Sequence, residues 1–331
     1  MTRARALWFR GPRAVEIGEV DLPSPGPEDV LVRSLWSGIS GGTELLAYRG
    51  QIDPSLVLDE ALGGMTGSFT YPFRYGYCCV GRVEPSSPSL PEGTLVVALH
   101  PHQDCFVAPV ADVVVLGEEP PRLATLLPLV ETSLQIRLDA GPVAGEVVAV
   151  TGLGAVGLLT SLLLQRSGAE VLACDRSPWR RELAASLGLT AVDPDRLPGE
   201  VAAATGARGV PLLVEVSGNP DALGRGLDLL AHEGTALVAS WYGTKSASLP
   251  LGGAFHRRRL VLRSTQVSTI PASLAGEWTV ERRRAAARSL LATLPLEHLA
   301  THEFAFADAA AAFAALDRGE EGLLHAALRY E

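Results

Sequence analysis

The stretch VVAVTGLGAVG, residues 147–157, decides the fold of this 331-residue chain. Its first half is a continuous apolar run, typical of a buried strand, and its second half places Gly152, Gly154 and Gly157 in the spacing GxGxxG. A helical pattern follows, and the next apolar run, EVLACD, ends at Asp175. Because strand, glycine turn, helix and a second strand ending in an acid occur in that order, the sequence predicts a dinucleotide-binding turn.

Each glycine has a separate task in such a turn. Gly152 permits the tight turn, Gly154 lets the backbone approach a pyrophosphate, and Gly157 allows the helix to pack closely on the strand. Amide groups at the helix N-terminus would bind the phosphate oxygens. We therefore predict a cofactor-binding turn formed by Gly152, Leu153, Gly154, Ala155, Val156 and Gly157. A methyltransferase with a similar turn, or a turn that binds no ligand, is the alternative.

The acid at the end of the second strand bears on the choice of coenzyme. A carboxylate at Asp175 would accept hydrogen bonds from the adenosine ribose hydroxyls and repel a 2′-phosphate, which favours NAD over NADP. Arg176, Arg180 and Arg181 follow the acid, and an arginine in this position is able to receive the extra phosphate. We predict NAD as the cofactor and keep NADP as an alternative.

Strand and helix patterns continue to alternate after the turn, through PLLVEVSG, GTALVASW and RLVLRST. Repeated β-α units with short connections predict a doubly wound parallel sheet, which we place at residues 128–267. Ligands bind outside the carboxyl ends of the strands of such a sheet. The loops there predict the nicotinamide side of the site, formed by Ser217, Gly218, Ser240, Trp241 and Ser264.

The chain before Pro121 has a different pattern, in which short β-type runs such as DVLVRSLWSG and TLVVALH are separated by Gly and Pro. Strands at this spacing predict a compact barrel or sandwich. The last part of the chain contains a helical alanine-rich segment, FADAAAAFAALDRG, and is long enough to return to that first domain. We therefore predict a β-rich domain of residues 1–127 that is completed by residues 268–331.

Composition excludes several classes of protein. The formal net charge is −9 and the arginines form no broad basic face, so we expect no nucleic-acid partner. No apolar run approaches the roughly 18 residues of a membrane span, so we expect no membrane partner. The four cysteines contain no CxxC pair and suggest no disulfide framework. These features favour a soluble protein of the reducing cytoplasm.

The order of these parts resembles the medium-chain dehydrogenase/reductase superfamily, which is alcohol dehydrogenase-like. The landmarks are DVLVRSLWSGIS, GRVE, EGTLVVA, GLGAVG, VEVSG and EFAFADAAAAFAALDRG, and they cover nearly the whole chain. The stretches SGISGGTELLAYRG and YPFRYGYCCVGRV resemble the branch that includes bacteriochlorophyllide hydroxyethyl dehydrogenase. The resemblance implies a GroES-like catalytic domain, a Rossmann dinucleotide domain, a small-molecule substrate and a homodimer.

The resemblance also locates the positions at which zinc members of the superfamily bind their catalytic metal. In this chain they hold Ser40 or Gly41, Tyr77 and Leu127, none of which ligates zinc at neutral pH. The cysteines of the family's structural zinc lobe are missing as well, since Cys105 stands alone there. We predict no zinc. Two alternatives stay open: a carboxylate ligand at Glu131, and a different site built from Cys78, Cys79, Cys105, His100 and His102.

Without a Lewis acid, a side chain must donate the proton or stabilise the developing oxyanion. The candidates implied by the resemblance are Tyr77, His100, Thr43, Glu131, Ser40 and Glu44. His100 comes first because it follows EGTLVVA, where the family places a wall of the substrate pocket, and because an imidazole titrates near neutrality. Tyr77 takes a vacated ligand position. Thr43 matches the hydroxyl through which alcohol dehydrogenases pass a proton, whereas capping of the following helix is an equal alternative for Glu44.

These features predict a metal-independent NAD(P)-dependent oxidoreductase that interconverts a secondary alcohol and a ketone on a small or cyclic substrate. One alternative is an NADPH-dependent reductase of quinones or enones, since this reaction needs no Lewis acid. Another is a nucleotide-sensing protein that keeps the fold without turnover.

Overall fold

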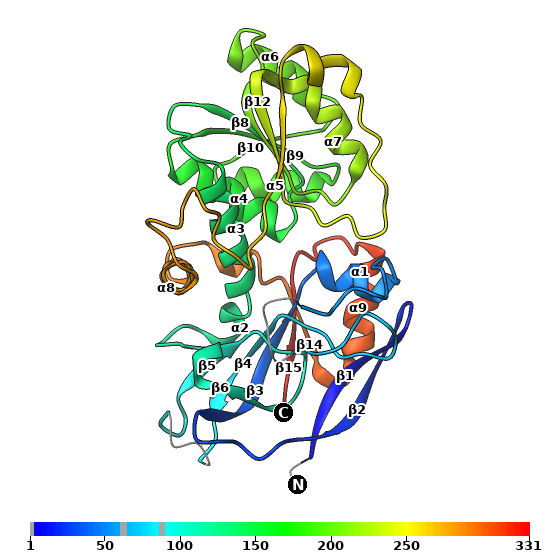
Figure 1. Cartoon of the computed structure of the whole chain (residues 1–331), viewed down its shortest axis with the longest axis vertical. Coiled ribbons are helices and arrows are strands. Elements are labelled where there is room, and N and C mark those ends of the chain that lie inside the picture. Colours follow the sequence, from blue (N-terminus) through cyan, green and yellow to red (C-terminus); the bar gives the residue numbers. More distant parts are fainter. Residues whose placement is uncertain (1–2, 60–64, 86–89) are drawn as a thin grey trace. The chain divides into compact units, whose positions relative to one another are not determined.

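The computed structural model describes residues 3–59, 65–85 and 90–331 (Figure 1). By their internal contacts these residues form two compact units. The first unit comprises Met1–Pro128 and Arg284–Glu331, and the second comprises Leu129–Arg283. The sequence predicts the second boundary near residue 267, whereas residues 268–283 associate with the second unit.

The second unit is built on a six-stranded sheet in which every pairing is parallel. The strands are β8 (Val147–Thr151), β9 (Glu170–Cys174), β10 (Thr190–Val192), β11 (Val210–Glu215), β12 (Leu230–Val238) and β13 (Val261–Ser264). Their order is β10-β9-β8-β11-β12-β13, the order of a Rossmann sheet, and it reverses direction between β8 and β11. The prediction of a doubly wound parallel sheet is confirmed.

Helices connect these strands where the sequence supplies start and stop signals. They are α4 (Ala155–Arg166), α5 (Pro178–Ser186), α6 (Leu197–Thr205) and α7 (Pro220–Gly226). The Ser177 hydroxyl accepts a hydrogen bond from the Arg180 amide at the start of α5, and Gly206 ends α6 in the left-handed conformation. The core of the unit contains buried aliphatic residues of α6, α7 and the sheet, including Leu197, Val201 and Leu223.

The first unit contains a seven-stranded sheet and a separate hairpin. The hairpin pairs β1 (Arg3–Gly11) with β2 (Ala14–Asp21). The sheet has the order β14-β15-β3-β4-β5-β7, and β6 also pairs with β3. Its strands are β3 (Asp29–Ile39), β4 (Cys78–Val83), β5 (Leu95–Ala98), β6 (Cys105–Pro109), β7 (Val113–Val115), β14 (His302–Ala305) and β15 (Ala326–Arg329).

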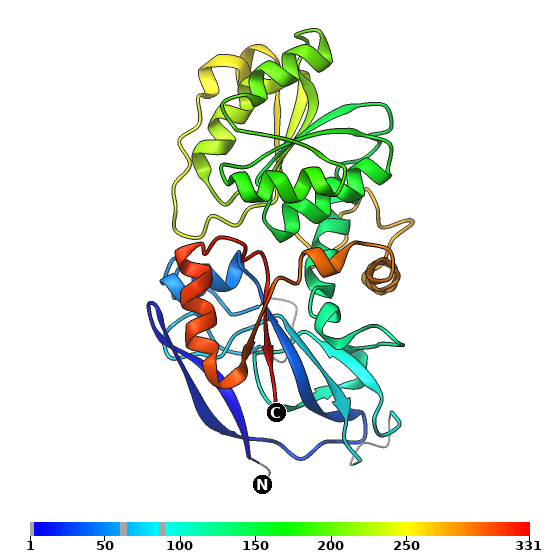
Figure 2. The same cartoon turned by 180° about the vertical axis from the view of Figure 1, so that it is seen from behind.

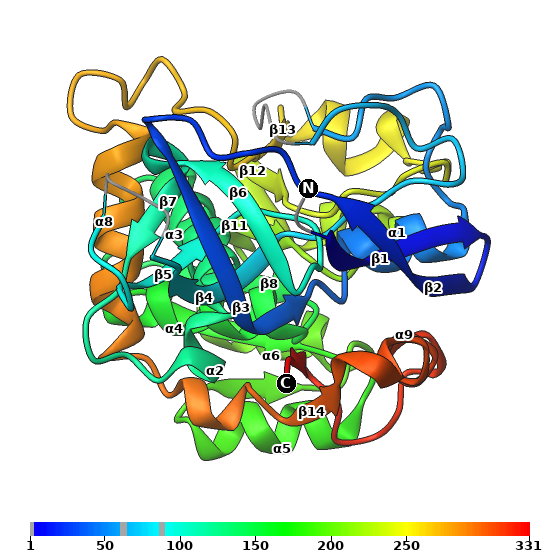
Figure 3. The ribbon, with the colours of Figure 1, turned by 90° about the horizontal axis from the view of Figure 1, so that it is seen from below.

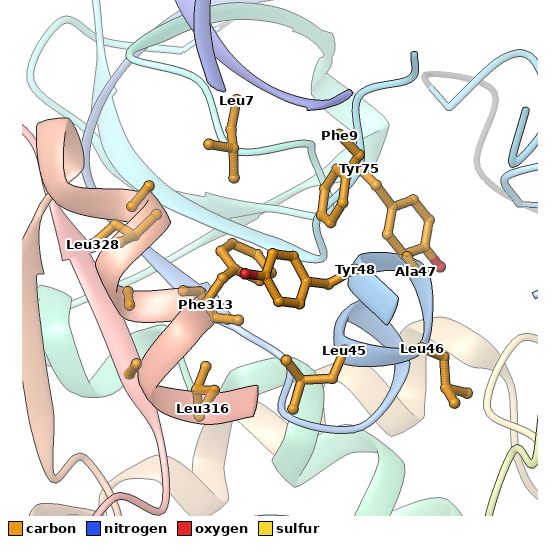
Figure 4. Packing of buried hydrophobic residues seen from close by; sticks show 14 of the residues in the cluster. Leu7, Phe9, Leu45, Leu46, Ala47, Tyr48, Tyr75, Phe313, Leu316 and Leu328 are labelled. Carbon is orange, nitrogen blue, oxygen red and sulfur yellow. The ribbon is translucent and has the colours of Figure 1, made fainter. Parts of the chain in front are cut away.

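The returning C-terminal segment completes this first unit. Strand β15 pairs antiparallel with β3, for example Ala327 opposite Gly38. Helix α9 (Ala309–Arg318) lies beside β2 (Figures 2 and 3). Phe313 of α9 packs edge-on against Phe9 at 5.4 Å, in a core shared with helix α1 (Thr43–Arg49) (Figure 4).

The remaining elements connect these parts. Helix α2 spans Pro121–Ala124, α3 spans Leu127–Asp139 and α8 spans Val280–Leu291. Short 3₁₀ turns occupy Val110–Asp112, Leu227–Leu229, Leu296–His298 and Phe306–Asp308, and a π-type turn occupies Leu251–Phe255. Among the residues described, no helix has the length and apolar character needed to cross a membrane.

Candidate functional site

The glycine turn of the second unit has no room for side chains at two of its positions. Gly152 has a φ of +101°, and a Cβ atom there would lie 2.6 Å from the Cα of Ser217. A Cβ atom on Gly157 would collide with the carbonyl oxygen of Gly152. Both positions therefore require glycine for the fold itself.

The third glycine faces open space. No atom lies within 4 Å of a Cβ built on Gly154. This residue is the N-cap of α4, and as a glycine it offers no side-chain acceptor to the first amides of the helix. Ala155 and Val156 begin α4, and Leu153 is buried before it. The first amides of this 12-residue helix therefore adjoin a space that a side chain at residue 154 would fill. These residues fit the pyrophosphate of a dinucleotide.

Asp175 lies just after β9 and links that strand to the glycine turn. One carboxylate oxygen accepts from the Leu153 amide at 2.8 Å, and the other accepts from the Ser177 amide at 2.8 Å. The Arg180 guanidinium lies 3.5 Å away. Oδ2 accepts from both Leu153 and Arg180, whereas Oδ1 accepts from Ser177 alone and keeps a further lone pair, so the acid is able to accept from a ribose hydroxyl while it holds the turn.

The arginines near Asp175 differ in their surroundings. Arg181 donates to the carbonyl oxygens of Asp175 and Arg176 at 2.7 and 2.9 Å, and it forms an ion pair with Asp193. Arg176 itself is exposed. Arg181 is therefore engaged in local structure, and Arg176 and Arg180 are better placed to meet a 2′-phosphate.

The loops after β11 and β12 are joined by a buried carboxylate that sequence reasoning missed. Glu215 is fully buried and accepts from the Ser217 amide at 2.8 Å, the Ser217 hydroxyl at 2.5 Å and the Tyr242 hydroxyl at 2.6 Å. Burial, and then the hydrogen bond to Glu215, raise the pKa of Tyr242. An acid within the apolar run PLLVEV was the available signal.

The structure also shows where the other residues predicted for the nicotinamide side lie. The Gly218 amide donates to the Ser240 hydroxyl at 2.8 Å, so the two loops are in direct contact. Trp241 is 41% exposed, and Ser264 ends the edge strand β13. Ser217 is hydrogen-bonded to Glu215 and directly precedes Gly218, and Ser264 pairs with Val238, two residues before Ser240.

Glu131 is committed to an ion pair within the second unit. Its Oε1 atom accepts from the Nε and Nη2 atoms of Arg283 at 3.1 and 3.0 Å. Arg283 is buried and also donates to Gln135 at 2.6 Å. The carboxylate therefore neutralises a buried guanidinium and joins α3 to α8, which is a structural task.

In the first unit, the loop that resembles a zinc loop is held by a carboxylate. Glu44 lies in the first turn of α1 and is fully buried. Its Oε1 atom accepts from the Ser40 amide at 2.9 Å, and its Oε2 atom lies 2.7 Å from Nε2 of His102. Gly42 caps α1 without a side-chain hydrogen bond. Glu44 therefore closes the loop onto itself rather than capping the amides of the helix.

Tyr77 belongs to a small group of hydroxyls. Its phenol oxygen lies 2.7 Å from that of Tyr75, and the Thr43 hydroxyl is its other hydrogen-bond partner. Burial is the main cause that raises the pKa of Tyr77 to about 12; the hydrogen bond from Tyr75 opposes this rise, the charges of Asp59 and Glu44 add to it, and the bond from Thr43 opposes it least. Tyr77 is therefore a neutral phenol at physiological pH.

His100 is a neutral imidazole. Its Nδ1 atom lies 2.8 Å from the Pro101 carbonyl oxygen, to which it donates, and its ring stacks on Phe106 at 4.2 Å. Burial lowers the pKa of His100 to about 4. The ring thus presents the Nε2 lone pair and carries no acidic proton at neutral pH, which removes the reason for ranking His100 first among the proton donors.

The donor groups in the first unit do not fit zinc. Leu127 is apolar and buried, and Tyr77 is held as a phenol. Burial raises the pKa of Cys78, Cys79 and Cys105, so thiols rather than zinc-binding thiolates are present. Across residues 3–59, 65–85 and 90–331, no three His, Cys, Asp or Glu side chains gather as a metal site would require.

Comparison with known proteins agrees with this architecture. Residues 155–279 match the family model described as zinc-binding dehydrogenase. L-threonine 3-dehydrogenase of Pyrococcus horikoshii is 28% identical over 264 residues, which are 70% of this chain and 73% of that protein. The structure of 2R,3R-butanediol dehydrogenase from Bacillus subtilis has a TM-score of 0.80 at 20% identity, covering 98% of this chain and 99% of that one. A dehydrogenase from Escherichia coli, solved with NADH, has a TM-score of 0.79 at 17% identity, covering 99% and 100%.

The fold, the glycine turn and these relatives define one class of protein. The family-model match, the dehydrogenase relatives and the fold together support the medium-chain dehydrogenase/reductase superfamily and an NAD(P)-dependent enzyme of that superfamily. The predicted pairing of a GroES-like β-rich domain with a Rossmann domain is confirmed.

Proposed function

We propose that the protein is a zinc-independent oxidoreductase that interconverts a secondary alcohol and a ketone on a small or cyclic substrate with NAD(P). The observation that carries this proposal is the Tyr77 phenol, which is hydrogen-bonded to Tyr75 and Thr43. It stands at a position where the superfamily resemblance implies a zinc ligand. The relatives' names, threonine 3-dehydrogenase and butanediol dehydrogenase, support a hydroxyl-bearing small molecule as substrate.

The second unit would hold the coenzyme. The α4 amides beside Gly154 would bind its pyrophosphate, Asp175 would bind its ribose, and the loops joined by Glu215 would line its nicotinamide side. When bound, the coenzyme supplies hydride chemistry at the substrate carbon. Asp175 supports NAD, and the exposed Arg176 supports some acceptance of NADP.

The first unit would manage the proton. During reduction the Tyr77 hydroxyl would donate its proton to the carbonyl oxygen of the substrate, whose carbon would take up the hydride that the coenzyme supplies, so that the C–O double bond becomes single. Hydrogen bonds from Tyr75 and Thr43 then stabilise the phenolate that remains, because they oppose the rise in the pKa of Tyr77. Solvent restores the proton, and oxidation of the alcohol follows the reverse order.

The decisive experiment compares Tyr77→Phe with the unchanged protein. We expect turnover to fall by about 10² to 10⁴-fold, the usual contribution of a general acid, while coenzyme affinity stays the same. Tyr71→Phe is the matched control. The Tyr71 hydroxyl donates to the Ala47 carbonyl and does not belong to the cluster formed by Tyr75, Tyr77 and Thr43.

Elemental analysis and a substrate panel complete this test. We expect turnover to persist in a chelator, with no zinc retained in proportion to the chain. Full turnover by Tyr77→Phe, or activity that depends on one zinc per chain, would contradict the proposal. Turnover of enones and quinones without turnover of alcohols would favour the reductase alternative. The homodimer stays a prediction that size measurement in solution will test.

A further inference from the structure

His102 is the centre of a buried polar chain in the first unit. Its side chain and that of Glu44 are both inaccessible to solvent, and Nε2 lies 2.7 Å from the carboxylate. Its Nδ1 lies 2.8 Å from the Ser37 hydroxyl, which in turn lies 2.9 Å from the Tyr330 hydroxyl. With the Ser40 amide on the other carboxylate oxygen, every ring nitrogen and carboxylate oxygen of the pair has a partner.

The direction of these hydrogen bonds follows from the chemistry of the groups. An ionised carboxylate only accepts hydrogen bonds, so Nε2 of His102 carries the hydrogen that points to Glu44. The ring then accepts the Ser37 hydroxyl at Nδ1 when it is neutral, and donates to it when it is protonated. In both states the imidazole fixes the position of the Glu44 carboxylate.

His102 also contacts the backbone that carries the two phenols. Gly76 lies between Tyr75 and Tyr77, and a Cβ atom on it would lie 3.0 Å from both Cδ2 and the backbone nitrogen of His102. The backbone carbonyl of His102 accepts from the Leu7 amide at 2.9 Å, which ties it to β1. The imidazole therefore lies between the Glu44 carboxylate and the segment that holds Tyr77.

Because Glu44 and His102 are both buried, the closed loop depends on the contact between them. A buried carboxylate without a partner is strongly unfavourable, so loss of the imidazole would open the loop and hydrate the acid. The Phe313 ring packs against His102 edge-on at 6.2 Å and keeps this region apolar. His102 therefore keeps the Glu44 carboxylate paired and in place within the closed loop.

We propose that His102 is a positioning residue for Tyr77: together with Glu44 it fixes a negative charge and a closed loop beside the phenol, and so keeps the phenol protonated and buried. This role rests on the function proposed above only for its effect on turnover. Three sets of titratable groups face this cluster. Tyr77 is surrounded by Tyr75, Asp59 and Glu44. Glu44 is in turn surrounded by Cys78, Cys79 and Tyr330, and His100 lies beside His102.

Ionisation of Tyr77 provides a readout that a purely structural role would not move. The protein labelled with 3-fluorotyrosine, whose phenol is more acidic than that of tyrosine, gives one fluorine NMR signal for each of its six tyrosines. Tyr77→Phe assigns the signal of interest. The midpoint of its pH titration is then compared across variants that remain folded by circular dichroism.

Three variants distinguish charge, hydrogen bond and packing. For Glu44→Gln and His102→Leu we expect the midpoint of Tyr77 to fall by about one pH unit or more, because the charge or the closed loop is lost. His102→Gln keeps an N–H donor to Glu44 and should stay within about 0.3 of the original midpoint. The control is His325→Leu, which removes another buried histidine of the same unit and should leave the midpoint unchanged.

The outcomes are decisive in each case. An unchanged midpoint in folded His102→Leu would overturn the proposal, and if that variant does not fold, an unchanged midpoint in Glu44→Gln would do so. The titration needs no turnover. Failure of the function proposed above therefore appears as full activity in Tyr77→Phe, whereas failure of this inference appears as unmoved titrations.

Discussion

The glycine turn of the second unit and the loop before α1 in the first unit are both rich in glycine, but different forces hold them. In the turn, backbone atoms fill the space that a side chain at Gly157 would need. In the loop, a Cβ on Gly41 would meet only Leu316 at 3.9 Å, and one on Gly42 would meet nothing within 4 Å. The loop is closed instead by the Glu44 side chain. Where backbone atoms leave no room for a side chain, as at Gly157, a substitution disrupts the fold. Where a side chain closes the loop, as Glu44 does, other residues of the loop can be substituted while its conformation is kept.

The most severe test of this contrast is Gly157→Ala. Because the added methyl group would collide with the Gly152 carbonyl, we expect the second unit to lose about 4 kcal/mol or more of stability and its coenzyme affinity. Gly42→Ala, in open space and at a φ of −95°, should change stability by less than about 0.5 kcal/mol. Urea unfolding measures both. Equal losses in the two variants would remove the distinction.

Gly154→Ala separates folding from binding within the same turn. A methyl group there meets no atom of the protein, so stability should stay near its original value. It would occupy the space where a pyrophosphate approaches the backbone, so we expect coenzyme affinity to fall by about 100-fold, or 2.7 kcal/mol. Calorimetric titration measures the affinity. Unaltered affinity would show that the coenzyme does not approach Gly154.

The buried pair of Glu131 and Arg283 tests whether the second unit also depends on side chains. Replacing Glu131 with Ala leaves the Arg283 guanidinium buried without its carboxylate, so we expect a loss of about 3–5 kcal/mol in unfolding free energy. The double variant Glu131→Leu and Arg283→Met should recover most of this loss, because it removes both charges. Reduced turnover with unchanged stability in Glu131→Gln would instead indicate a catalytic carboxylate.

The glycine turn could be predicted from the sequence, whereas the buried side-chain pairs could not. The glycine turn could be predicted because its determinants lie within six residues and next to a strand. No motif predicts the role of His102, and its partner Glu44 lies 58 positions away. Glu131 and Arg283 are 152 positions apart. Pairings of this kind are created by the packing of distant segments, so residue type and spacing do not disclose them.

The stability of the first unit should depend on pH, because this unit contains a buried histidine. His325 is buried, and burial lowers its pKa to about 4, from an ordinary value of 6.5. The unfolded chain therefore binds a proton that the folded chain refuses, so stability is complete above pH 6.5 and falls as the pH decreases toward 4. The loss should reach about 3 kcal/mol. Urea unfolding at a series of pH values measures it.

His325→Phe provides the control for this pH dependence. The variant should lose the part of the slope between pH 6.5 and 4 that His325 contributes, while His100, whose pKa is also lowered to about 4, keeps its own part. A slope that is the same in both proteins would show that His325 is protonated in the fold.

The side chain of Asp175 supports the glycine turn of the second unit. Its substitution should have the smallest effect of those considered, a change in coenzyme preference. Asp175→Asn keeps one acceptor oxygen for the Leu153 or the Ser177 amide but loses the negative charge. We expect the preference for NAD over NADP to narrow by about tenfold, or 1.4 kcal/mol, because repulsion of the 2′-phosphate is removed. Arg176→Ala should weaken the binding of NADP alone, since the adenosine ribose of NAD carries no 2′-phosphate for this exposed guanidinium to meet. If calorimetry finds the same coenzyme ratio in Asp175→Asn as in the original protein, then the carboxylate serves the turn and the backbone alone selects the coenzyme.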